Sequence, residues 1–195
     1  GITPLLAFQW GRWRLASGGA SALLSLGRKP VDAGLSTQVF QSDRWSMSTS
    51  FQWDQGRGSS DAPLLQGMPE VDGTLRGRLS VGYRIASRWS LGLGASQDLL
   101  GHGGGLLMSG GLTYHQPLTV RSYWDVSLGV QWGSATYMRS YYGVAPDVAA
   151  ALGRAAYVPG AGVNNLSLGW GMASALTDRW VVFGNVSVSS LQGDA

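Results

Sequence analysis

The chain has 195 residues, with 30 glycines and nine tryptophans but only 13% charged residues and no cysteine. A soluble all-β domain of this size would normally carry more charge on its outer faces. The absence of cysteine excludes disulfides and thiolate metal sites. The net charge of +3 is spread along the chain, so we expect no nucleic-acid partner. No apolar run approaches the roughly 18 residues of a membrane helix, so any membrane crossing would use strands.

Alternation of apolar with polar or small residues predicts ten strands in five hairpins. The clearest hairpin is Thr74 to Asp98, whose arms are each about ten residues long, the length that a tilted membrane strand needs. On this hairpin alone a soluble sandwich is an equal alternative, although its strands are usually shorter. The other expected strands are Thr3 to Trp10, Trp13 to Leu26, Gly34 to Gln41, Trp45 to Trp53, Leu106 to Tyr114, Tyr123 to Trp132, Asn165 to Leu176 and Trp180 to Leu191.

Five short connections carry an arginine and are followed by a tryptophan, which predicts one rim of a barrel. Tryptophan suits the membrane interface and arginine the water just beyond it. The expected interface belt is Trp13, Trp45, Trp89, Trp124 and Trp180. The arginines that we expect to face the periplasm, where they would dock a partner, are Arg12, Arg44, Arg88, Arg121 and Arg179.

The other connections are longer and rich in glycine and proline, which places the outer loops at the opposite rim. The longest, Gly133 to Asn164, is expected to hold one short helix that begins at Pro146 and ends at Gly153. These observations predict an all-β, antiparallel up-and-down transmembrane β-barrel, with residues 1–195 as a single domain. We expect a trimmed fragment of ten strands that lacks one strand at each end, so that the intact protein has twelve.

Three arginines, Arg76, Arg78 and Arg84, are expected to share the inward face of one strand. Charges in a barrel lumen need partners, so the favoured interpretation is a charge ladder. The candidate partners are Asp54, Asp98 and Asp125. An anion-favouring constriction in a pore is the alternative.

The long loop also carries the most tyrosines, Tyr137, Tyr141, Tyr142 and Tyr157. We expect these rings to pin the loop into the barrel mouth, with a ligand or partner surface as the alternative.

The two histidines, His102 and His115, are expected at opposite rims, so they cannot share a metal ion. No metal site or cofactor is therefore expected. A hydrolase could use His102 with Asp98 and a serine, but an exposed turn histidine is the favoured interpretation. The glycine run around His102 is not a phosphate loop, because no helix follows it.

Three segments resemble the MltA-interacting protein family, also called MipA/OmpV. These are Tyr137 to Ala145 with its downstream Ala156-Tyr157 and Gly160 to Val163, then Ser96 to Leu99 with Gly101 to Gly104, and finally Ser190 to Ala195. They occur in the family's order at the predicted loop borders.

The resemblance implies a non-enzymatic protein of the bacterial outer membrane, in contact with its lipid. It further implies a scaffold that links a lytic transglycosylase to a peptidoglycan synthase; other members are described as adhesins, immunogenic surface proteins or envelope-stress factors. A small-solute pore or ligand-sensing barrel is the alternative, and an outer-membrane hydrolase is the third hypothesis.

Overall fold

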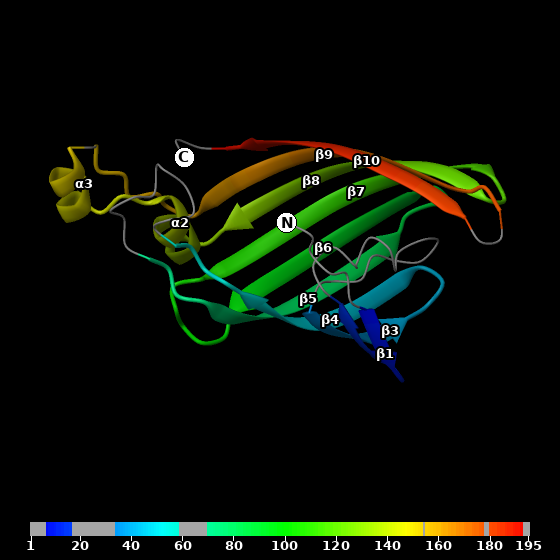
Figure 1. Ribbon diagram of the computed structural model, residues 1–195, viewed down its shortest axis with the longest axis horizontal. Helices are drawn as coiled ribbons and strands as arrows, with labels where there is room; N and C mark the ends of the chain where they lie inside the picture. The colour runs from blue at the N-terminus through cyan, green and yellow to red at the C-terminus, as the bar shows by residue number, and fades with distance from the viewer. Residues whose placement is uncertain (1–6, 17–33, 59–69, 154, 178–179, 193–195) are drawn as a thin grey trace.

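The computed structural model describes residues 7–16, 34–58, 70–153, 155–177 and 180–192, which form one antiparallel sheet (Figure 1). Each strand pairs with its neighbours in the sequence, in the order β1 to β10. The strands are β1 (Ala7–Trp10), β2 (Trp13–Ala16), β3 (Gly34–Gln41), β4 (Trp45–Asp54), β5 (Thr74–Arg84), β6 (Trp89–Asp98), β7 (Leu106–Thr119), β8 (Ser122–Gly133), β9 (Gly162–Ala175) and β10 (Val181–Leu191).

The prediction of an all-β antiparallel sheet is confirmed, but some strand ends differ from those expected. β7 continues past Tyr114 to Thr119, because the ladder with β8 persists through His115 and breaks its register only after Pro117. β9 begins at Gly162, three residues before the predicted start, and its register shifts opposite Gln131. The remainder of the expected Trp13 to Leu26 strand lies outside the described residues.

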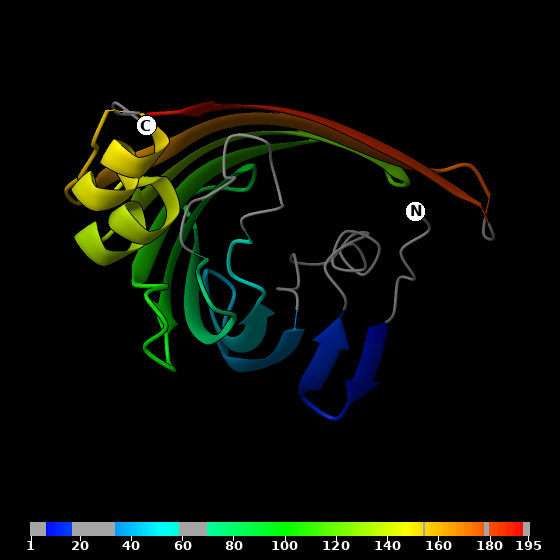
Figure 2. The same cartoon turned by 60° about the vertical axis from the view of Figure 1, so that its left-hand side comes forward.

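The sheet bends into an arch with β1 and β10 at its two edges (Figure 2). These two strands do not pair with each other, so the described sheet is open. Because consecutive strands are antiparallel, all short turns lie at one end of the arch and all long connections at the other. We call these ends the turn rim and the loop rim.

The two faces of the sheet differ in chemistry, as the period of two predicts. One face, the apolar face, continues across neighbouring strands through Leu128, Leu168 and Val188. These side chains are 55%, 51% and 67% exposed. Among the described residues the only buried apolar side chains are Met138, Ala149 and Ala173, so no apolar layer packs against this face. The apolar face is therefore uncovered by the described part of the chain.

The polar face holds most of the buried polar side chains. It continues across β6, β7 and β8 through Gly94, Ser109 and Gln131. Nearer the loop rim it includes Thr74 and Arg76, which are 1% and 6% exposed. Polar side chains are thus more buried than apolar ones in this sheet, the reverse of a soluble domain.

Two short helices lie in the connection between β8 and β9: α2 (Ala135–Tyr142) and α3 (Pro146–Leu152). The expectation of one helix is therefore wrong. The predicted helix is α3, which starts at Pro146 and ends at Gly153 in the left-handed conformation with φ 63°. The missed helix, α2, starts at Ser134, whose side chain caps the amide of Tyr137.

Neither of the two described helices is long and apolar enough to cross a membrane.

Candidate functional site

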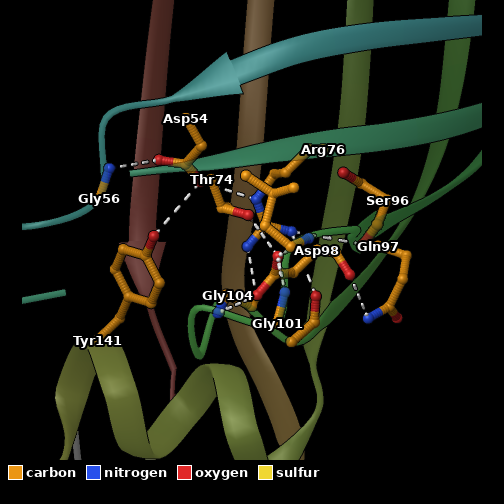
Figure 3. A network of polar contacts seen from close by, with 12 residues as sticks. Asp54, Gly56, Thr74, Arg76, Ser96, Gln97, Asp98, Gly101, Gly104 and Tyr141 are labelled. Atoms are coloured by element: carbon orange, nitrogen blue, oxygen red, sulfur yellow. Dashed lines mark hydrogen bonds and ion pairs between the residues drawn. The ribbon is translucent and has the colours of Figure 1, made fainter. Parts of the chain in front are cut away.

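The candidate site lies at the loop rim and is organised around Arg76 of β5 (Figure 3). Its Nε donates to Oδ2 of Asp54 in β4 at 2.7 Å. Its Nη2 donates to the carbonyl of Gly104, and Nη1 lies 3.4 Å from the carbonyl of Gly105. A buried guanidinium needs this many acceptors, because an unpaired buried charge is costly. Arg76 therefore joins β4 and β5 to the β6–β7 loop.

Asp98, at the end of β6, is the second centre of the site. Its carboxylate accepts a hydrogen bond from the hydroxyl of Thr74 and further bonds from the amides of Leu100 and Gly101 at 3.0 Å each and of Gly104 at 2.9 Å. The loop can wrap around one carboxylate because glycines at its bends adopt positive φ, 76° at Gly101. The glycine-rich β6–β7 loop thus surrounds the carboxylate of Asp98.

Helix α2 is attached to the same residues. The phenol of Tyr141 donates to Oδ2 of Asp54 at 3.3 Å, and Cζ of Arg76 lies 5.6 Å from the centroid of the Tyr137 ring. Arg57, in the connection after β4, donates to the carbonyl of Tyr141 at 3.0 Å. A cation at a helix C-terminus is favourable, because it satisfies a free carbonyl.

The start of α2 is hydrogen-bonded to the first residue of β7. The hydroxyl of Ser134 accepts from the amide of Leu106 at 3.0 Å, and α2 packs against β7, β8 and β9. The helix therefore connects β7–β9 with β4 and β5, which lie on the other arm of the arch (Figure 2). We call Asp54, Thr74, Arg76, Asp98, Tyr137 and Tyr141 the loop-rim network.

The predicted tyrosine group is partly brought together. Tyr137 stacks on Tyr141 with ring centroids 4.6 Å apart, and Tyr142 meets Tyr137 edge-on at 6.2 Å. Burial, with the neighbouring phenols of Tyr142 and Tyr141, raises the pKa of Tyr137. Burial and nearby Asp54 likewise raise the pKa of Tyr141, so both phenols are neutral hydrogen-bonding groups. Tyr157 lies apart from the stack, where its backbone pairs with Val144.

Within the described part of the chain, the expected charge ladder shows a close ion pair on β5 between Arg76 and Asp54. Arg78 lies on the same face, with its guanidinium beside Gly94. Arg84 is exposed at the opposite end of the strand. Asp125 does not pair with an arginine of β5; its Oδ1 lies 2.5 Å from Nδ1 of the cross-strand residue His115.

The hydrolase hypothesis is not supported by the position of His102. Its Nδ1 lies 2.7 Å from the carbonyl oxygen of Gly73, and Asp98 is instead bonded to Thr74 and loop amides. No group of three His, Cys, Asp or Glu residues in the described ranges could hold a metal ion.

The turn rim carries the predicted arginines as exposed side chains in the connections. These are Arg12, Arg44, Arg88 and Arg121; Arg179 lies outside the described residues. Arg88 donates to Oε1 of Gln116 at 2.9 Å, a contact that is itself exposed.

The predicted tryptophans follow these turns. Trp13, Trp45, Trp89 and Trp180 are 37%, 48%, 42% and 72% exposed, and Trp124 is half-buried. Tyrosines on neighbouring strands flank three of them, with centroid distances of 4.5 Å for Trp45 to Tyr83, 4.9 Å for Trp89 to Tyr114 and 5.6 Å for Trp124 to Tyr114.

The sequence predicted Arg76 and Asp98 as lumen charges, and it predicted Tyr137 and Tyr141 as part of a separate loop tyrosine group. It indicated Asp54 only as a pairing partner and did not indicate Thr74. Asp98 followed by glycines at 101, 103, 104 and 105 was an available signal, because an Asp with several following positive-φ positions suits a loop closed on its own carboxylate.

Next to the network the polar face lines a partly open cavity of about 380 Å³. Its walls come from five consecutive strands, β4 to β8, and include Gln52, Asp54, Arg78, Ser109 and Gln131.

A single antiparallel sheet with an uncovered apolar face and a hydrogen-bonded polar face defines an all-β protein whose architecture fits an outer-membrane β-barrel. The family model described as MltA-interacting protein MipA matches residues 1–195. The chain belongs to this family, which confirms the resemblance found in the three loop-border segments. No curated protein sequence and no solved structure matches the chain.

Proposed function

We propose that residues 1–195 are a single domain whose strands belong to an outer-membrane β-barrel. The observation that carries this proposal is the exposure of the apolar face. Side chains such as Leu128 and Val188 would be unfavourable in water over so large a continuous surface, whereas lipid accommodates them. The exposed tryptophans of the turn rim suit the interface of that lipid layer.

We further propose that this barrel is a non-enzymatic scaffold that docks peptidoglycan-remodelling enzymes in the periplasm. The support is family membership: the family is named for interaction with MltA, a lytic transglycosylase. A peptidoglycan synthase is the second proposed partner. In this proposal the turn rim faces the periplasm, since its short connections are typical of that side.

The docking surface in this proposal is the set of turn-rim arginines, Arg12, Arg44, Arg88, Arg121 and Arg179. The four described ones are exposed and sit on different turns, so together they present a row of positive charge. Such a row steers an acidic partner surface and fixes its orientation more than it adds affinity.

The test is binding of a purified lytic transglycosylase to the full-length protein in detergent. Replacing Arg12, Arg44, Arg88 and Arg121 together by Glu should abolish capture, and Arg88→Glu alone should weaken it and reduce its salt dependence. Arg139→Glu is the matched control, because Arg139 is an exposed arginine at the loop rim. Capture that survives the fourfold reversal would refute docking at this rim.

A small-solute pore or ligand-sensing barrel is the second candidate. The cavity of about 380 Å³ on the polar face favours it. Planar-bilayer recordings of the full-length protein decide the pore version: discrete conductance steps support a pore, and their absence at saturating protein rejects it.

A further inference from the structure

The cavity on the polar face has walls whose hydrogen-bonding groups are largely unused. The side chains of Gln52, Ser96 and Ser109 make no hydrogen bond to any other described residue, although all three line the cavity. Gln52 is exposed, but Ser96 and Ser109 are half-buried, and half-buried polar groups normally have partners. Their convergence on one space therefore indicates that something polar fills it.

Gln131 adds a group with a fixed orientation. Its Oε1 accepts a hydrogen bond from Nδ2 of Asn164 at 3.2 Å, which leaves the amide NH₂ to donate into the cavity. Asn164 is 1% exposed, and its own Oδ1 has no hydrogen-bond partner in the described structure. This buried amide pair holds Gln131 in place at the β8 wall, which is how a polar recognition group is positioned in advance.

The floor of the cavity is shaped by Gly94. A Cβ at this position would lie 2.7 Å from Oγ of Ser109 and 3.4 Å from Nη2 of Arg78. The absence of a side chain therefore lets the guanidinium of Arg78 extend from β5 across β6 and approach Ser109 on β7. The N–H donors of the Arg78 guanidinium thus lie along the floor of the cavity, near the hydroxyl of Ser109.

Three charged side chains line the cavity, Asp54, Arg76 and Arg78. Arg76 is paired with Asp54, and Arg78 has an interaction of its own, so neither arginine is free to compensate an ionic ligand. Burying an uncompensated ion is costly. The volume of about 380 Å³ falls within the range of small-molecule sites.

We propose that this cavity is a binding site for a small neutral ligand rich in hydroxyl groups, such as a mono- or disaccharide. Amides and hydroxyls both donate to and accept from vicinal hydroxyl pairs, a guanidinium donates to them, and these are the group types that line the walls. Asp54 and Arg76 line the cavity and also hold α2, so an occupied cavity contacts the loop-rim network directly. The proposal of this binding site does not depend on whether the turn rim docks an enzyme.

The experiment is isothermal titration calorimetry of the full-length protein in a detergent without a sugar headgroup. The probes are glucose, maltose and glucose 6-phosphate. We expect saturable binding of glucose or maltose, with the phosphate ester binding no more tightly than glucose.

Gln52→Leu removes an exposed amide with no described hydrogen bond, so it does not disturb the fold, and Gln131→Leu removes the positioned amide. Each should weaken saccharide binding about tenfold, the effect of losing one good hydrogen bond to the ligand. Gln38→Leu is the matched control, because Gln38 lies on the same polar face in β3 but outside the cavity. Its affinity should equal that of the unsubstituted protein.

Three results would overturn the proposal. The first is no heat from either neutral saccharide at concentrations up to tens of millimolar. The second is a saccharide affinity that stays unchanged in Gln52→Leu and Gln131→Leu, as it should in the control Gln38→Leu. The third is tighter binding of glucose 6-phosphate than of glucose, which would assign the cavity to anions.

Discussion

The two rims of the arch are built in opposite ways. At the loop rim, Arg76 and Asp98 are nearly buried, and each makes several hydrogen bonds to a neighbouring strand and to the β6–β7 loop. At the turn rim, Arg88 and its neighbours are exposed, and the side chains of the His115–Asp125 contact near that end are 45% and 34% exposed. Charge is structural at one rim and available to solvent at the other.

The difference separates residues that stabilise the fold from residues that are available for recognition. A sheet with both edges unpaired and no apolar core beneath it depends on other devices to keep its curvature. The loop-rim network supplies one by tying α2 to both arms of the arch. The turn rim has no comparable network among the described residues, so its arginines can be changed without loss of the fold.

The largest expected effect comes from removing the centre of the loop-rim network. Arg76→Leu leaves Asp54 without its ion pair and should lower the free energy of unfolding by about 3–5 kcal/mol, as for other buried pairs that lose one partner. Arg84→Leu, on the same face and strand but exposed, should change it by less than about 0.5 kcal/mol. Urea unfolding in detergent measures both, and equal effects would remove the distinction between the rims.

The next effect tests the fit of the glycine loop against α2. Gly105 has φ +53°, and a Cβ there would lie 2.6 Å from the backbone nitrogen of Tyr137. Gly105→Ala therefore combines a left-handed backbone with overlap and should cost about 3 kcal/mol in unfolding free energy. Gly101→Ala has φ +76° but open space around it, so its cost should be about 1–2 kcal/mol. Thermal unfolding of both variants should rank them in this order; the reverse order would mean that the loop does not pack on α2.

A smaller effect is expected from the phenol that joins α2 to β4. Tyr141→Phe removes one hydrogen bond to Asp54 and should cost about 1 kcal/mol. Tyr157→Phe is the control, since the Tyr157 hydroxyl makes no described hydrogen bond. The test is proteolysis of the native protein: cleavage within the α2 segment should rise for Tyr141→Phe alone, and unchanged cleavage would show that α2 is held without this contact.

The smallest effect on stability is expected at the turn rim. Arg88→Glu loses exposed contacts with Gln116 and Tyr114, so the unfolding free energy should change by less than about 0.5 kcal/mol. A loss above 2 kcal/mol in the same urea titration would mean that the turn rim is also structural.

Most of the sheet could be predicted because its signal is local. In β8, Trp124, Val126 and Leu128 alternate with Asp125 and Ser127, and a period of two needs no knowledge of distant residues. The same locality explains the predicted α3, where a proline and a glycine mark the ends. The ends of β7 and β9 were less accurate, since a register shift depends on the partner strand.

The loop-rim network could not be assembled from sequence because its members are far apart in the chain. Tyr141 and Asp54 are 87 positions apart, and their contact requires that α2 exist and lie inside the arch. Helix α2 was itself missed because Ser134 and Met138 gave a weak pattern beside the clear Pro146 signal. The prediction that Asp125 could pair with a β5 arginine failed because register places His115 directly opposite it.

The central claim is that the apolar face meets lipid and the polar face meets water. Because the chain has no cysteine, single substitutions report this directly. Ser127→Cys and Leu128→Cys are adjacent in β8 and lie on opposite faces. In intact outer-membrane vesicles, a membrane-impermeant maleimide should modify the first and spare the second, and both should react after denaturation. Equal modification of the two in intact vesicles, or modification of the second alone, would contradict the account.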